Sequence, residues 1–342
     1  VWMLATLAAT TNVGAVKHLF KVGGLVGSLR RLLESSSDEA CRRYSLICVG
    51  NIAGGNKTLC PELLLKGGVL EPVLQLLTTK GGEVPDQLMR RAAAAALTHL
   101  CRGKPMVKVT VIQPTLRTLA HLVNDSDVEI VHCALLALAA LTSCSSEELQ
   151  HILVTGCLPR IVSLLHYPDD RLVAAAVDAV GNVCSGNDMQ TQLAINQGAL
   201  PALCRLLAHP SVGIRKNAAF ALSNVASGNE DQITAVFAAG VFPELFKIAL
   251  DPESSPALLK EVVFGIVNAT SGGSQDHARD LVKLGALSAL GAAFGCADVK
   301  ICEQALGGVD NLLDVGVQMQ HVEKLGANPF VEEFITEPLM LS

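Results

Sequence analysis

Aromatic residues are scarce in this chain: they make up 4% of its 342 residues, although 50% of the residues are hydrophobic. β-Sandwiches and barrels rely on aromatic and β-branched side chains, so the shortage argues against them. The abundance of Ala and Leu instead favours helices. A single globular core normally stops growing below this length, so we expect either several domains or an elongated repeat array.

Several other features are missing. No apolar run reaches the roughly 18 residues that suggest a membrane span, and no signal-peptide pattern opens the chain. The 26 basic and 32 acidic residues form no long run of one sign, which argues against nucleic acid or an anionic membrane as the main partner. The 11 cysteines include no CxxC pair, so we expect a reducing compartment. Because the chain lacks an initiator Met and begins within an apolar helical pattern, we expect a fragment without its N-terminal part.

Catalytic and metal-binding patterns are also missing. The sequence has no GxGxxG, P-loop, GxSxG or HExxH motif. Its nine His have no spacing that predicts a metal site, and the adjacent His132 and Cys133 would point apart on a helix. We therefore expect no enzyme, no cofactor and no metal.

Internal similarity is what the chain has in abundance. The phrase "GCLPRIVSLL" at Gly156 returns as "GALPALCRLL" at Gly198 and "GVFPELFKIA" at Gly240, at two intervals of 42 residues. Each unit predicts a short helix that stops at the Gly, a second helix that starts near a Pro, and a long third helix. A period of about 40 to 47 residues with two or three helices is typical of armadillo and HEAT repeats. We predict an all-α, right-handed superhelical armadillo solenoid of about eight three-helix units, forming one domain over residues 1–342.

An Asn recurs at one register of the third helices. We define eight ladder positions by aligning these helices on Thr6, Asn51, His99, Ala140, Asn182, Asn224, Asn268 and Asn311. Asn is a mediocre helix former, so five Asn in register need an explanation. A line of amides can donate to and accept from the backbone of an extended peptide. The structural alternative is that each Asn caps its own helix or bonds the next repeat's loop. The Ser-Gly that follows several of them is more simply a helix stop.

Four phrases resemble the armadillo repeats of the importin-alpha family, the adaptors for nuclear localisation signals: "FALSNVASGNEDQITAVFAAGVFPELFKIAL", "NATSGGS", "GNVCSGNDMQTQ" and "LTHLCRGKP". The resemblance covers most of the chain. It implies a Trp four residues before most ladder Asn, so that the two side chains share one face of the helix. In that family the Trp planes hold lysine stems, the Asn side chains hold the peptide backbone, and acidic residues pair with the charges.

The chain departs from that pattern at the wall positions, which we define as the residues four before each ladder position. They read Trp2, Ile47, Ala95, Leu136, Asp178, Phe220, Phe264 and Gly307. The C-terminal half keeps more of the family's pattern, since Asp188 follows Asn182 as the family's acid does and Glu261 lies about one turn before Phe264. We expect the peptide-binding residues to be Trp2, Asn51, Asp178, Asn182, Asp188, Phe220, Asn224, Glu261, Phe264, Asn268 and Asn311.

The resemblance implies an import adaptor that binds basic segments of cargo proteins, mainly in its C-terminal half, and works in the cytoplasm and nucleus. The family's N-terminal basic segment, which binds the carrier importin-beta, is not among these residues, so that carrier is implied only through a missing segment. The alternative is an armadillo scaffold for a non-nuclear assembly, which the loss of every ladder Trp except Trp2 motivates. Neither hypothesis includes nucleic-acid binding or membrane insertion.

Overall fold

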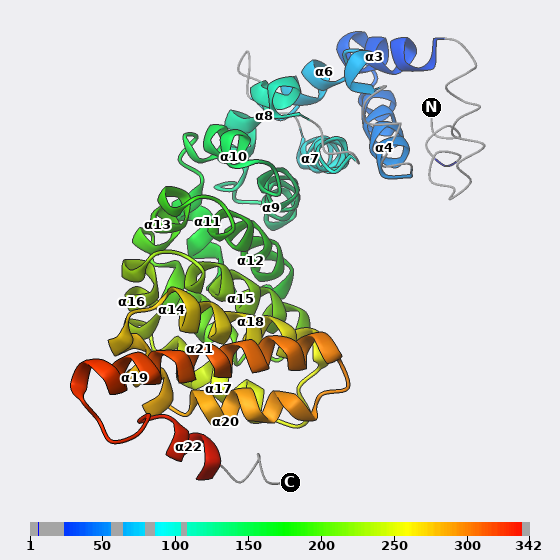
Figure 1. Ribbon diagram of the computed structural model, residues 1–342. Helices are drawn as coiled ribbons and strands as arrows, with labels where there is room; N and C mark the ends of the chain where they lie inside the picture. Colours follow the sequence, from blue (N-terminus) through cyan, green and yellow to red (C-terminus); the bar gives the residue numbers. More distant parts are fainter. Residues whose placement is uncertain (1–5, 7–23, 56–63, 79–85, 104–107, 337–342) are drawn as a thin grey trace. The chain divides into compact units, whose positions relative to one another are not determined.

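The computed structural model describes residue 6 and residues 24–55, 64–78, 86–103 and 108–336. Every regular element among these residues is helical, as Figure 1 shows. No single helix in the described ranges is long and apolar enough to cross a membrane; α16 (Glu230–Ala238) and α17 (Val241–Leu250) reach that length only as a pair bent by 75°. Trp2 lies outside the described residues.

The chain divides into two compact units, unit 1 over Val1–Ile161 and unit 2 over Val162–Ser342. The described helices of unit 1 are α3 (Leu25–Ser35), α4 (Glu39–Gly55), α6 (Leu70–Gln75), α7 (Gln87–Cys101), α8 (Val109–Leu122), α9 (Val128–Thr142) and α10 (Ser146–Leu153). The boundary between the units falls within α11 (Leu158–Leu164).

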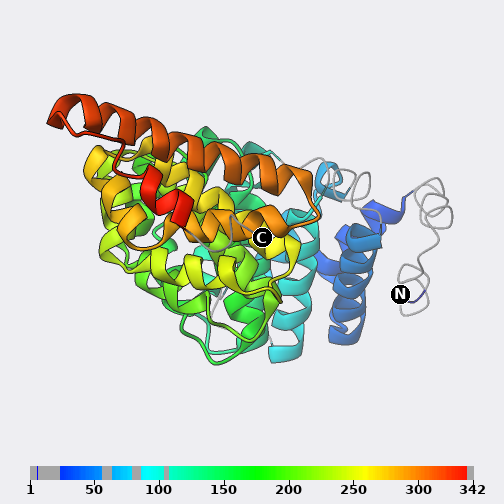
Figure 2. The same cartoon turned by 60° about the horizontal axis from the view of Figure 1, so that its bottom comes forward.

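Unit 2 repeats one three-helix pattern. In addition to α16 and α17, its helices are α12 (Asp170–Cys184), α13 (Asp188–Asn196), α14 (Ala199–Leu206), α15 (Val212–Ala226), α18 (Pro256–Gly272), α19 (Gln275–Lys283), α20 (Ala286–Ala292), the 3₁₀ turn η1 (Ala293–Gly295), α21 (Val299–Glu323) and α22 (Val331–Thr336). Figure 1 shows the third helices α12, α15, α18 and α21 side by side in one layer. In Figure 2 the long α21 runs along one edge of this unit, with the short α22 beside α20. The predicted all-α armadillo architecture is confirmed.

In four successive repeats a glycine with positive φ joins the first and second helices. The φ angles of Gly156, Gly198, Gly240 and Gly285 lie between 69° and 100°. Residues with a Cβ rarely adopt this left-handed conformation, so the Gly allows the chain to turn from one helix directly into the next. The pattern read from the sequence as a helix stop therefore has the expected backbone geometry.

Small residues let neighbouring third helices approach closely. A Cβ on Gly265 of α18 would lie 3.4 Å from Cα of Ser223 on α15, and one on Gly308 of α21 would lie 2.9 Å from Cγ2 of Val267 on α18. The apolar faces of these helices are buried against each other and against the second helices. Because no single repeat encloses its own core, the units depend on this stacking for stability.

The Gly of the Ser-Gly pair after α15 makes room for the side chain of Gln232. Gly228 has no positive φ; instead, a Cβ there would collide with Oε1 of the buried Gln232. The same side chain donates from Nε2 to the Asp188 carbonyl of the preceding repeat at 2.9 Å. The helix-stop interpretation was incomplete for the pair at 271–272, because α18 continues through Gly272 and ends before Gly273.

We predict that Gly228→Ala destabilises the protein by about 1–3 kcal/mol, since the new methyl group has to displace Gln232 from a closely packed site. Urea denaturation followed by circular dichroism measures this effect. Gly213→Ala is the matched control, because the nearest heavy atom to its new Cβ is Oγ of Ser211 at 3.8 Å. Equal stability of the Gly228→Ala variant and the wild type would contradict the packing argument.

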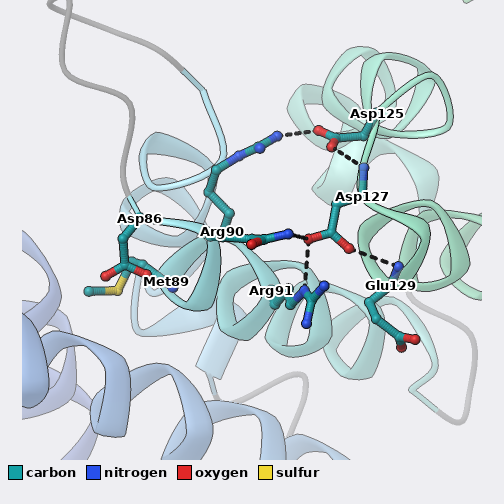
Figure 3. Close-up of polar contacts among 8 residues, drawn as sticks. Asp86, Met89, Arg90, Arg91, Asp125, Asp127 and Glu129 are labelled. Carbon is teal, nitrogen blue, oxygen red and sulfur yellow. Dashed lines mark hydrogen bonds and ion pairs between the residues drawn. The ribbon is translucent and has the colours of Figure 1, made fainter.

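In unit 1 an ion-pair network joins two neighbouring repeats, as Figure 3 shows. Oδ2 of Asp127 accepts hydrogen bonds from Nε of Arg91 and Nε2 of Gln87, both at 2.7 Å, and Arg90 pairs with Asp125. Oδ1 of Asp127 accepts from the backbone N–H of Glu129 at 3.0 Å and so caps α9. The Asp127 side chain is only 3% exposed. Burial alone would raise the pKa of this carboxyl, but the three donors outweigh it and lower the pKa below its usual value.

A pH dependence of stability follows from this network. The pKa of Asp127 is lower in the folded than in the unfolded state, so its ionised form stabilises the protein above about pH 4 and that contribution is lost as the pH falls through the folded pKa. We expect Asp127→Asn to cost about 1–3 kcal/mol at neutral pH, with the difference shrinking below about pH 4. Urea titrations at several pH values measure it, with the exposed Asp280→Asn as control. A difference that stays constant with pH would contradict this prediction.

Candidate functional site

Most of the predicted binding residues lie in unit 2. Nine of them occupy α12, α15, α18, α21 and the start of α13: Asp178, Asn182, Asp188, Phe220, Asn224, Glu261, Phe264, Asn268 and Asn311. Asn51 belongs to α4 of unit 1. The candidate site is therefore the row of third helices in unit 2, and we call it the unit 2 face.

Each ladder amide of the last repeats is held by the preceding third helix. Asn224 donates from Nδ2 to the Gly181 carbonyl at 3.4 Å, and Asn268 donates to the Ser223 carbonyl at 2.9 Å. Asn311 donates to Oγ1 of Thr270 at 3.1 Å. The sequence suggested that each Asn either caps its own helix or bonds the loop of the next repeat. The structure shows neither for these three, because each amide bonds the third helix of the previous repeat. The bond fixes the orientation of the amide, which prepares it for recognition without further ordering.

The held amides keep part of their hydrogen-bonding capacity. Asn224, Asn268 and Asn311 are half-buried, and no described residue donates to their Oδ1 atoms. Each amide carries two N–H donors and a carbonyl acceptor, so one bond to the neighbouring helix leaves a donor and an acceptor. An extended peptide backbone offers the complementary pair of groups at every residue.

Two aromatic side chains stand beside this ladder. The Phe220 ring packs on the neighbouring helix, where a Cβ on Gly181 would lie 3.3 Å from Cδ1 of the ring. Phe264, one repeat further, is 40% exposed. Both rings occupy wall positions, and they lie on the neighbouring third helices α15 and α18. Aromatic faces attract both aliphatic stems and cations.

The flanking wall positions have a different chemistry. Asp178 on α12 accepts a hydrogen bond from Nδ2 of Asn217 on α15, which ties its carboxylate across to the next helix. Gly307 on α21 has no heavy atom within 4 Å of the place where a Cβ would lie, so that wall is open. The aromatic character of the unit 2 face is therefore confined to α15 and α18.

Two of the predicted carboxylates lie on the elements that carry or follow the ladder Asn. Asp188 begins α13, is exposed, and accepts from Nδ2 of Asn229 at 3.5 Å. Glu261 lies one turn before Phe264 on α18. The described residues include no ion-pair partner for either carboxylate. This arrangement favours positively charged ligands.

A row of hydroxyl groups was missed by the sequence analysis. Three residues after the ladder Asn, the exposed Ser185, Ser227 and Ser271 donate from Oγ to the carbonyl of Asn182, Asn224 and Asn268 at 2.8, 2.7 and 3.1 Å. Because each proton is committed to the helix, the oxygen remains available only as an acceptor. The sequence did show these Ser residues, as part of the recurring Ser-Gly pair, but the pair was interpreted only as a helix stop.

The unit 2 face is suited to recognition. Cys184, two residues after Asn182, is fully buried, and burial raises the pKa of its thiol to about 12, so it remains protonated. Within the described residues, no group of three His, Cys, Asp or Glu side chains could hold a metal ion. The arrangement offers oriented amides, aromatic faces and carboxylates, which are groups suited to binding a ligand rather than to transforming it.

We predict that Asn268→Ala lowers the free energy of unfolding by about 1 kcal/mol, because the Ser223 carbonyl loses the bond that links α15 to α18. Chemical denaturation measures the change. Asn196→Ala is the control: that amide is exposed at the end of α13 and bonds only Gln192 of its own helix among the described residues, so its removal should change stability little. Equal effects of the two substitutions would contradict a role for the ladder amide in holding repeats together.

Comparison with known proteins agrees with this geometry. The armadillo/beta-catenin-like repeat family matches residues 145–185 and 187–227. Importin subunit alpha-1b of Oryza sativa subsp. japonica is 34% identical over 167 residues, which are 49% of this chain and 30% of the rice protein. Importin subunit alpha-2 of Arabidopsis thaliana is 34% identical over 169 residues, 48% of this chain and 30% of that protein. The matches thus span about half of this chain and less than a third of each relative.

Solved structures share the fold. An engineered protein superposes with a TM-score of 0.82 at 24% identity and covers 99% of this chain and 80% of its own. A designed armadillo repeat protein in complex with the peptide (KR)4 has a TM-score of 0.56 at 25% identity, covering 84% of this chain and 99% of its own. The repeat match and these structures show an armadillo-repeat fold, and about half of the chain is similar to importin subunits alpha.

Proposed function

We propose that this armadillo-repeat chain is a peptide-binding adaptor that recognises basic segments of other proteins on its unit 2 face. The observation that carries the proposal is the ladder of Asn224, Asn268 and Asn311, whose amides are oriented by the preceding helix and keep a donor and an acceptor. The extended backbone of a peptide pairs with such a ladder independently of its sequence.

Specificity for a basic ligand comes from the groups around the ladder. A Lys or Arg stem lies between Phe220 and Phe264, where the aromatic faces stabilise both its methylene groups and its charge. The carboxylates of Asp188 and Glu261 supply the counter-charge. The neighbour solved with the peptide (KR)4 is a designed armadillo protein with alternating Lys and Arg in its ligand, which supports this chemistry for the fold.

The similarity to importin subunits alpha supports nuclear import as the process. The proposed ligands are then nuclear localisation segments of cargo proteins, and the protein works in both the cytoplasm and the nucleus. An importin-beta-type carrier is proposed only through a segment outside these 342 residues. Under this hypothesis the chain carries no catalytic role and no cofactor.

One observation favours a second candidate, an armadillo scaffold for a non-nuclear assembly. Of the described wall positions only Phe220 and Phe264 are aromatic, and Gly307 leaves its wall open. A face with so few aromatic walls offers fewer places for lysine stems. Recovery of structural proteins without basic segments from a pull-down would favour this candidate.

We predict that the chain binds a bipartite Lys/Arg-rich peptide and that Asp188→Lys combined with Glu261→Lys weakens this binding at least tenfold, because two attractive carboxylates become repulsive. Fluorescence anisotropy at increasing salt measures the affinity, and screening should weaken the wild-type complex. An acidic peptide serves as the ligand control.

Glu253→Lys is the control variant, since Glu253 is exposed in the loop between α17 and α18 and its substitution reverses one charge away from the ladder. Binding that survives the double reversal would place the ligand elsewhere. Failure of the wild type to bind any basic peptide would favour the scaffold candidate.

A further inference from the structure

The third helices of unit 1 present a different surface from those of unit 2. Their described wall positions are Ile47 on α4, Ala95 on α7 and Leu136 on α9. Leu88 lies two turns before Ala95 and therefore on the same side of α7. Ile47 is 38% exposed and Leu88 is 57% exposed. Because α4 packs on α7 and α7 on α9, these side chains form one aliphatic face, which we call the unit 1 face.

The charge of the unit 1 face is also different. Arg43 lies one turn before Ile47, and Arg102 is exposed at the C-terminal end of α7. Neither guanidinium has an ion-pair partner among the described residues. Helix α7 contains no Asp or Glu, and the acids of α4 and α9 are confined to their first turns. A ligand of this face therefore gains from aliphatic side chains and carboxylates.

The residues at the ladder positions of unit 1 indicate whether a ligand there is extended or helical. Of the three ladder positions here only Asn51 is an amide, since the next two are His99 and Ala140. The His99 ring packs on α4, where a Cβ on Gly54 would lie 2.9 Å from its Nδ1. An extended peptide would find fewer amide partners for its backbone on this face than on the unit 2 face. A helix satisfies its own backbone hydrogen bonds and needs only an apolar stripe to dock.

We propose that the unit 1 face is a second docking surface, which binds an amphipathic acidic helix of a partner protein. The aliphatic stripe of that helix packs on Ile47, Leu88 and Leu136, and its flanking carboxylates meet Arg43 and Arg102. This site is separate in residues and in ligand chemistry from the peptide site proposed for unit 2. The chain thereby holds two different partners.

The experiment uses the full chain and a labelled synthetic helix of about 18 residues, long enough to be helical in water, with Leu along one stripe and Glu beside it. A second helix with Lys in place of every Glu tests the charge. Fluorescence anisotropy should show binding of the acidic helix and at least tenfold weaker binding of the Lys helix. Ile47→Ser and Arg102→Glu should each weaken the acidic complex about tenfold or more.

Two control variants separate this site from other causes. Arg117→Glu makes the same charge change at an exposed residue of α8, and Phe264→Ala alters the unit 2 face; both should leave the acidic helix bound as in the wild type. No binding of the acidic helix, equal binding of the Lys helix, or an equal loss in Arg117→Glu would overturn the proposal. Binding of the basic peptide to the same samples is measured independently, so either site can fail alone.

Discussion

The close approach of neighbouring third helices is the contact on which the rest of each unit depends. An armadillo repeat is too small to enclose its own apolar side chains, so its core exists only between repeats. Gly308 allows that approach in unit 2, because a Cβ there would lie 2.9 Å from Val267 of the preceding helix, and a Cβ on Gly265 would be in van der Waals contact with Ser223. The ladder amides of Asn224 and Asn268 then bond carbonyls of that same helix and set the register between repeats.

The same Asn side chains can hold neighbouring repeats together and still offer hydrogen-bonding groups to a ligand. An amide bonded to the preceding helix has already lost its rotational freedom. A ligand that bonds its remaining donor and acceptor therefore pays a smaller conformational-entropy cost on binding. The Ser hydroxyls three residues later follow the same logic, because donation to the helix leaves only their acceptor capacity toward solvent. The recognition proposed for the unit 2 face would thus use groups that the repeat has already positioned.

The sequence predicted the repeats better than the chemistry of individual side chains. The Gly-to-Gly interval of 42 residues gave the three-helix unit, because positive φ and helix periodicity are local properties. The partner of each Asn lies more than 40 residues away, as for Asn268 and Ser223, and no local pattern identifies it. The role of Gly228 was also hidden, since it depends on where Gln232 packs and not on the backbone of the glycine itself.

Packing and recognition occupy different positions of the third helix, and this separation lets the surface change while the fold stays. The buried positions that meet the next helix are restricted to small or well-fitting residues, as at Gly181 and Ser223. Several wall positions meet the neighbouring helix less tightly: Gly307 has open space around it, and Ile47 and Phe264 are partly exposed. Substitution at such positions costs little stability. One scaffold can therefore carry an aliphatic, cationic surface in one unit and an aromatic, acidic surface in the other.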